Sequence, residues 1–417
     1  MSDFALIWDW LEFAVRWLHV ITAMAWIGAS FYFIALDLGL NRNIPGPADG
    51  EEWQVHGGGF YHIQKYLVAP DAMPEHLVWF KWESYTTWIS GAALLMIVYW
   101  AGGELYLIDQ TKTDMSLFIG IVISALSLSV GWLVYDFLCK SKLGEQPTVL
   151  MVLLFILLVA MGYAYNQIFT GRAVLLHLGA FTATIMTANV FFIIMPNQRI
   201  VVADLKAGRA PDPKYGKIAK LRSTHNNYLT LPVIFLMLSN HYPLAFGTDY
   251  NWIIASLVFL MGVSIRHYFN SMHARKGEPN WTWLVTAVLF ILIMWLSTAP
   301  LRQDTYEASE TRELTTTEQA FAGAEGFDEV ASIVPGRCAM CHSREPSWEG
   351  ITHAPKGILL ETPADITAAA RLIYLQSGVT HAMPPANVTW MEEEERIQIV
   401  RWYRDALEDI PFTLARN

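Results

Sequence analysis

The chain has 417 residues, of which 53% are hydrophobic and only 16% are charged. A soluble domain usually carries about 25% charged residues, so this composition excludes an ordinary soluble enzyme. The charge is also uneven, because residues 301–417 hold 10 Lys and Arg against 19 Asp and Glu, which is −9 of the total of −10. We therefore expect two parts, a nearly neutral apolar part and an acidic polar part.

Eight apolar segments in the first part are long enough, or nearly so, to cross about 30 Å of hydrocarbon. They lie at 11–37, 80–101, 116–138, 148–169, 173–195, 228–246, 252–272 and 281–299. The first segment has no basic region before it, so we expect a membrane helix rather than a removable signal peptide. The predicted fold is all-α, and this part is expected to be a polytopic bundle of eight transmembrane helices in contact with membrane lipid.

The orientation of the bundle follows from the basic residues in its connections. The first, third, fifth and seventh connections carry 13 Lys and Arg, and the second, fourth and sixth carry 2. Connections rich in Lys and Arg stay in the cytoplasm. In a bacterial inner membrane, both termini and the polar C-terminal part are then expected in the periplasm.

The eight segments read as two sets of four. Segment 1 contains "LHVITAMAWIGASFYFI" and segment 5 contains "LHLGAFTATIMTANVFFII", which places His19 and His177 at equivalent depths. Segments 2 and 6 open with "WESYTTW" and "HNNYLTL", which aligns Tyr85 with Tyr228. The common order of these matches predicts a duplicated four-helix unit.

A covalent haem site is predicted in the polar part by "CAMCH", residues 338–342. Two thiols three residues apart, with a histidine directly behind the second, are typical of c-type haem attachment. Cys338 and Cys341 then form the thioethers and His342 supplies the proximal nitrogen. A zinc site requires further ligands, and Cys139 is the one remaining cysteine. A disulfide leaves the histidine unexplained.

The second axial ligand of this haem is predicted to be Met383, in "SGVTHAMPPANVTW", because a thioether raises the reduction potential. His381, His353 and Met391 are the alternatives. Amphipathic helices are expected at about 317–333, 363–377 and 391–408. An N-terminal helix, CxxCH, a methionine loop and a C-terminal helix in this order resemble a small class I cytochrome c. The predicted domains are therefore a membrane domain at 1–300, a linker at 301–316 and a periplasmic cytochrome c domain at 317–417.

Polar residues inside a bilayer are costly and often functional. His19, His177 and His241 are predicted near the outer face, where a pair of them would bind a non-covalent b-type haem close to the cytochrome domain. The alternative for each is a hydrogen bond to a neighbouring helix.

A second polar group lies toward the cytoplasmic side. The stretch "HNNYLTLPVIFLMLSNHYP" carries His225, Asn226, Asn227 and Tyr228 at its start, and such amide and imidazole groups suit a flat polar heterocycle. Arg266 suits an anionic ligand, and His225, His267 or Glu83 is a candidate proton acceptor. The alternative is a buried structural network with Arg266 extending to the membrane surface.

The whole chain resembles the membrane-bound urate hydroxylases of the PuuD type, on the residue 225–243 stretch followed by a C-terminal cytochrome c. The first segment is also similar to the LHxxxxxxWxG helix of the HemJ and CopD membrane families. The resemblance implies oxidation of urate to 5-hydroxyisourate, with electrons leaving through haem c to a soluble cytochrome c or terminal oxidase. It assigns no urate-binding residues.

Three other functions fit parts of the sequence. They are a quinol-oxidising electron-transfer subunit, a porphyrinogen oxidase fused to its electron acceptor, and a solute transporter with a tethered cytochrome. Reduction of the haem by urate without oxygen separates them from the urate hydroxylase. The sequence contains no nucleic-acid-binding signal.

Overall fold

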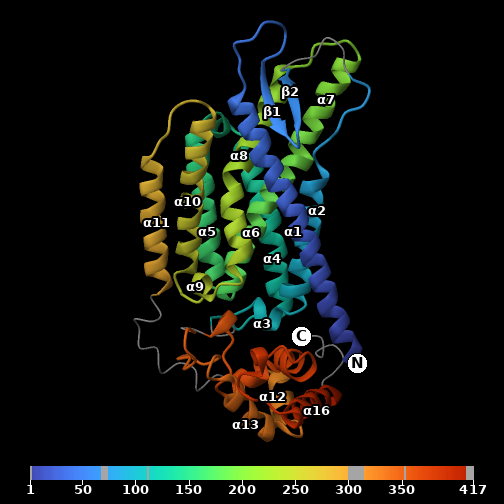
Figure 1. Ribbon diagram of the computed structural model, residues 1–417, viewed down its shortest axis with the longest axis vertical. Coiled ribbons are helices and arrows are strands. Elements are labelled where there is room, and N and C mark those ends of the chain that lie inside the picture. The colour runs from blue at the N-terminus through green and yellow to red at the C-terminus, as the bar shows by residue number, and fades with distance from the viewer. Residues whose placement is uncertain (1, 67–73, 110–111, 299–313, 352–353, 410–417) are drawn as a thin grey trace.

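The computed structural model describes residues 2–66, 74–109, 112–298, 314–351 and 354–409 (Figure 1). A bundle of long helices occupies most of the molecule. The C-terminal helices form a separate group at the end of the bundle where the chain begins, and the β-hairpin and α7 lie at the opposite end (Figure 1). The N-terminal end of α1 and the C-terminal part therefore lie together, as the predicted topology requires.

The first half of the bundle contains four long helical stretches with one short helix between them. They are α1 (Ser2–Gly39), α2 (Trp82–Leu94) continued by the π-helical turn η1 (Leu95–Trp100), α3 (Gly103–Tyr106), α4 (Leu117–Lys140), the 3₁₀ turn η2 (Lys142–Glu145) and α5 (Pro147–Asn166). α5 begins with a proline at its first turn, where the missing N–H costs no hydrogen bond.

The second half repeats this pattern of long helices. It contains α6 (Gly171–Ala188), the π-helical turn η3 (Asn189–Ile194), α7 (Met195–Lys206), α8 (Pro213–Ser239), α9 (Pro243–Phe246), α10 (Asn251–His273) and α11 (Trp281–Ser297). α8 continues through Pro232, and α10 approaches this proline closely because position 262 is glycine. A Cβ at Gly262 would lie 2.6 Å from the Cδ of Pro232. The duplication itself stays a prediction.

Within the described residues, five helical stretches are long and apolar enough to cross a membrane. They are Ile7–Gly39, Leu117–Lys140, Pro147–Asn166, Gly171–Lys206 and Asn251–His273. α11 is apolar but shorter, at 17 residues. α2 with η1 and α8 are helical as expected, but α2 is short and α8 carries many polar residues. The chain thus has the helices of a membrane protein, while the count of eight spans remains a prediction.

Two connections differ from the expectation. The predicted span at 228–246 ends at Ser239, because the chain turns at Asn240 and restarts as α9. The connection after α1 contains an antiparallel hairpin, β1 (Gly50–His56) and β2 (Gly59–Lys65). Its turn uses Gly57 and Gly58 at φ of 61° and 82°, which glycine adopts without strain.

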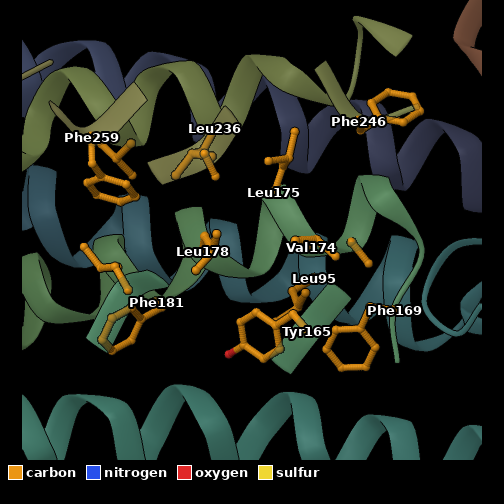
Figure 2. Packing of buried hydrophobic residues seen from close by; sticks show 14 of the residues in the cluster. Leu95, Tyr165, Phe169, Val174, Leu175, Leu178, Phe181, Leu236, Phe246 and Phe259 are labelled. Atoms are coloured by element: carbon orange, nitrogen blue, oxygen red, sulfur yellow. The ribbon is translucent and has the colours of Figure 1, made fainter. Parts of the chain in front are cut away.

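The core of the bundle lies around α6. Figure 2 shows Leu175 and Leu178 of α6 near Leu236 of α8, with Phe169 and Tyr165 on the α5 side. α8 approaches closely because position 179 is glycine, where a Cβ would lie 3.0 Å from the Cβ of Leu236. α6 is therefore a central helix. In contrast, little of the span in α1 is buried, as suits a helix facing lipid.

The C-terminal part has its own hydrophobic cluster. Its helices are α12 (Thr316–Gly323), α13 (Phe327–Cys338), the 3₁₀ turn η5 (Pro355–Gly357), α14 (Pro363–Ala368), α15 (Ala370–Ile373), the π-helical turn η6 (Tyr374–Val379), the 3₁₀ turn η7 (Pro385–Asn387) and α16 (Glu393–Asp409). The helix expected at 317–333 is divided in two, because Gly326 has a φ of 84°. Trp402 of α16 is fully buried and donates from Nε1 to the Phe321 carbonyl at 2.9 Å.

Candidate functional site

The polar stretch of α8 lies inside the bundle, between α6 on one side and α10 on the other. His225, Asn226 and Asn227 are all buried. Consecutive residues of a helix point in directions about 100° apart, and the three side chains accordingly contact different neighbours. The structure therefore divides the predicted cluster into two flanks.

The first flank of α8 faces α4 and η3. The Tyr135 hydroxyl lies 2.9 Å from Nδ1 of His225. The side-chain nitrogen of Asn189 donates to both the Tyr135 oxygen and Oδ1 of Asn226, at 2.9 Å each. Asn226 in turn donates to the Met186 carbonyl at 2.9 Å. These bonds join three helices through buried groups.

An ion pair extends the same flank toward the start of α8. Arg222 donates to Oδ1 of Asn189 at 3.1 Å and to Oδ1 of Asp136 at 2.7 Å. Asp136 also contacts the exposed Lys140 at 2.6 Å. An arginine can only donate hydrogen bonds, so the side-chain oxygen of Asn189 accepts from Arg222. The amide nitrogen of Asn189 is then the donor to the Tyr135 oxygen, and the Tyr135 hydroxyl donates its proton to Nδ1 of His225. The first flank is thus a connected hydrogen-bond network in which the charge of Arg222 is paired with Asp136.

The second flank of α8 faces α10 and α1. Nε of Arg266 donates to Oδ1 of Asn227 at 3.4 Å, and its NH2 group donates to Oδ1 of Asn270 at 3.0 Å. Asn270 donates to Oδ1 of Asn227 at 2.9 Å. The guanidinium carbon lies 4.4 Å from the ring centre of Phe31 on α1, a cation–π distance. Here a buried cation is held by neutral groups alone among the described residues.

The remaining candidates of this group lie apart from both flanks. Tyr228 is half-buried on α8, near enough to interact electrostatically with Arg266. His267 is exposed, with its ring 6.1 Å from that of Trp281. Glu83 is half-buried at the start of α2. The structure therefore joins Arg266 to Asn227, and joins His225 to Asn226, but it joins neither pair to His267 or Glu83.

The three histidines predicted near the outer face have different surroundings. His177 is fully buried and uses both ring nitrogens, with Nδ1 at 2.7 Å from the Ala173 carbonyl and Nε2 at 2.7 Å from the Ser124 hydroxyl. His19 uses Nδ1 for Thr87 and Ser90 at 3.0 Å, and its ring packs on Gly91. His241 is exposed. Within the described residues, no hydrogen bond or ring contact joins the three.

The CxxCH segment forms the last turn of α13 and the residues after it. The backbone N–H groups of Cys341 and His342 both donate to the Cys338 carbonyl, at 3.1 and 2.9 Å. His342 Nδ1 lies 2.9 Å from the Ile358 carbonyl, which leaves Nε2 for an iron, as in metal-bound histidines generally. Both thiols are free, and burial raises the pKa of Cys338 to about 12 and also raises the pKa of Cys341.

The methionine loop precedes α16. Met383 is half-buried, and its carbonyl accepts from Arg396 at 3.0 Å. Met391 is buried in the hydrophobic cluster and His381 is exposed, whereas His353 lies outside the described residues. The Thr389 hydroxyl is buried without a hydrogen-bond partner among the described residues. The donors that a c-type haem needs are thus available here, together with one orphaned hydroxyl.

Four residues of the α8 flanks were missed by the sequence analysis as site residues: Tyr135, Asn189, Arg222 and Asn270. The available signal was the isolated amide in "TANVFFII" and the polar residue one turn beyond Arg266. Polar side chains in apolar helices seek internal partners, so each was a candidate for the same network.

Among known proteins and families, the chain matches one family model. No curated protein and no solved structure matches the chain. The family model described as urate oxidase N-terminal matches residues 5–297. These residues include α1 to α11 and hence both flanks of α8. Since the match covers more than half of the chain, the chain belongs to the urate oxidase N-terminal family.

Proposed function

We propose that this protein is a membrane oxidoreductase that oxidises urate to 5-hydroxyisourate and passes the electrons to a C-terminal c-type haem and on to the respiratory chain. The observation that carries the proposal is a family match to urate oxidase over residues 5–297, in a chain that continues into CxxCH at 338–342. The reaction converts urate and water into 5-hydroxyisourate, two protons and two electrons. Water supplies the new oxygen.

The residues of the C-terminal part would hold haem c as the motif predicts. Cys338 and Cys341 would form the thioethers, His342 would bind iron through Nε2, and Met383 would be the second axial ligand. When bound, this group accepts electrons one at a time, so a second carrier within the bundle would be useful. The proposed haem b would be held by a pair drawn from His19, His177 and His241, and the Nε2 of His19 makes no hydrogen bond within the described residues.

The placement of the two parts supports this electron path. Arg371 of α15 pairs with Asp9 of α1 at 2.8 Å, and Gly357 of η5 lies against the Phe246 ring of α9. η5 therefore packs on the bundle, and the next residue, Ile358, is the hydrogen-bond partner of His342. With the periplasmic orientation proposed from the basic connections, the acidic C-terminal part would face a soluble cytochrome c or a terminal oxidase with a basic surface.

The test is anaerobic mixing of the purified full-length protein with urate. We expect reduced haem bands, and label from H₂¹⁸O in the product. Ubiquinol and protoporphyrinogen are the comparison donors, and the Cys338→Ala, Cys341→Ala double variant is the control that lacks covalent haem. Haem that stays oxidised with urate but is reduced by quinol would overturn the proposal.

A further inference from the structure

We infer that the second flank of α8 is a binding site for a planar anion, built from Arg266, Asn227 and Asn270. In this site Asn270 orients the side-chain amide of Asn227. The inference rests on the proposed function, because it identifies urate as bound there in its anionic form. It excludes the His225 flank as the place where the negative charge of the substrate is held.

The first step of the argument is charge. Arg266 is 5% exposed, and within the described residues no carboxylate lies within ion-pair distance of it. Arg222, on the first flank of α8, is also buried, but it contacts Asp136 at 2.7 Å. An isolated buried cation is costly. Arg222 has Asp136 as its counter-ion, as expected of a structural arginine. Arg266 has no counter-ion among the described residues, as expected of a site that receives an anion.

The second step is the direction of the amide groups. Both asparagine oxygens accept from Arg266, which can only donate. Asn270 then turns its amide nitrogen to Oδ1 of Asn227. This leaves the amide nitrogen of Asn227 as a donor with no hydrogen-bond partner among the described residues, although the residue is 0% exposed. Buried donors are seldom left unpaired in native proteins.

The third step is shape. The Phe31 ring covers one face of the guanidinium group, so ligand hydrogen bonds must come to its edge. The NH1 group makes no hydrogen bond within the described residues, and it lies on that edge. A ligand that accepts from NH1 or from the Asn227 amide nitrogen must offer oxygens or deprotonated ring nitrogens. The urate anion has this pattern, and a neutral purine with ring N–H groups in these positions does not.

The test is equilibrium dialysis of radiolabelled urate against the full-length protein, reduced beforehand with dithionite so that bound urate is not turned over. The main variant is Asn227→Asp. The new carboxylate keeps both acceptor contacts, pairs with Arg266 and removes the free donor. We expect at least about tenfold weaker urate binding with an unchanged or higher melting temperature, a combination that loss of a structural contact would not give.

Asn270→Asp is the second variant, because it also neutralises Arg266 and cannot donate to Asn227. Asn43→Asp, at an exposed position in the connection after α1, adds the same charge far from the site and should bind urate like the wild type. Wild-type protein that fails to bind urate, or Asn227→Asp that binds it within twofold of wild type, overturns the inference. Wild-type protein that binds urate but is not reduced by it overturns the proposed function and leaves the anion site standing.

Discussion

Ion pairs differ between the interior of the bundle and its junction with the C-terminal part. Inside the bundle, the side chains of Arg222 and Asp136 are 3% and 10% exposed, whereas those of Arg371 and Asp9 at the junction are 33% and 38% exposed. Removing one partner of a buried pair leaves an uncompensated charge in a medium of low polarity. An exposed pair is weakened by water and salt. The loss of stability on breaking an ion pair should therefore fall as the exposure of the pair rises. Three predictions test this order at ion pairs, and one tests the buried Arg266, which has no ion-pair partner among the described residues.

The largest effect on stability is expected for Asp136→Leu. This change leaves Arg222 buried without a carboxylate and should lower the free energy of unfolding by about 3–5 kcal/mol. Thermal unfolding followed by tryptophan fluorescence in detergent measures it. The double variant Asp136→Leu, Arg222→Met replaces the pair by apolar groups and should recover most of the loss. A double variant as unstable as the single one would show that the pair is not the cause.

Arg266→Gln should change stability little and activity strongly. Its removal takes away a buried cation that has no acidic partner in the described part of the chain, so we expect little loss of stability. Urate-driven haem reduction should fall at least about thirtyfold, the equivalent of about 2 kcal/mol for losing one partner of a desolvated charge interaction. Arg266→Lys keeps the charge without the planar guanidinium group, so its rate of urate-driven haem reduction should lie between those of the wild type and Arg266→Gln. Normal activity in Arg266→Gln would mean that both arginines of α8 and α10 are structural.

The long helices could be predicted from the sequence because lipid-facing and core positions both demand apolar runs. The division of the α8 cluster could not. Asn226 and Asn227 are adjacent and chemically identical, and only the neighbours brought by the fold, Asn189 for one and Arg266 for the other, give them different roles. The hairpin after α1 was missed because its alternation is weak and it lies in a polar connection.

The predicted haem-c ligands are a different case. CxxCH is a local pattern, so its residues can be proposed as ligands without any tertiary information, whereas the ligands of a non-covalent haem would come from different helices. His177 shows the difficulty. Its position in "LHLGAFTATIMTANVFFII" suggested a ligand, but the fold gives both of its ring nitrogens hydrogen-bond partners.

A smaller effect is expected at the Arg337–Glu395 pair, which links α13 to α16. Burial acts to raise the pKa of Glu395, but hydrogen bonds from Arg337 and the Glu392 N–H outweigh it and hold the pKa below its usual 4.5. A carboxyl group with a lowered pKa stabilises the fold above its unfolded value and loses this contribution as pH falls through the folded value. Glu395→Gln should therefore lower the melting temperature by a few degrees at pH 7. The difference should vanish in acid, and a difference that grows in acid would contradict the assignment.

The smallest effect is expected at Arg371 and Asp9, and it tests whether the junction between the two parts depends on charge. Exposed pairs contribute about 0.2–1 kcal/mol, so Asp9→Arg should slow haem reduction by urate at most about fivefold. The reversed pair, Asp9→Arg with Arg371→Asp, should restore the rate. Added salt should reduce the defect, because charges at an exposed junction are screened within about 8–10 Å. Since Gly357 and Phe246 also join the two parts, a loss greater than tenfold in the single variant would mean that this ion pair, and not the apolar contact, holds the C-terminal part against the bundle.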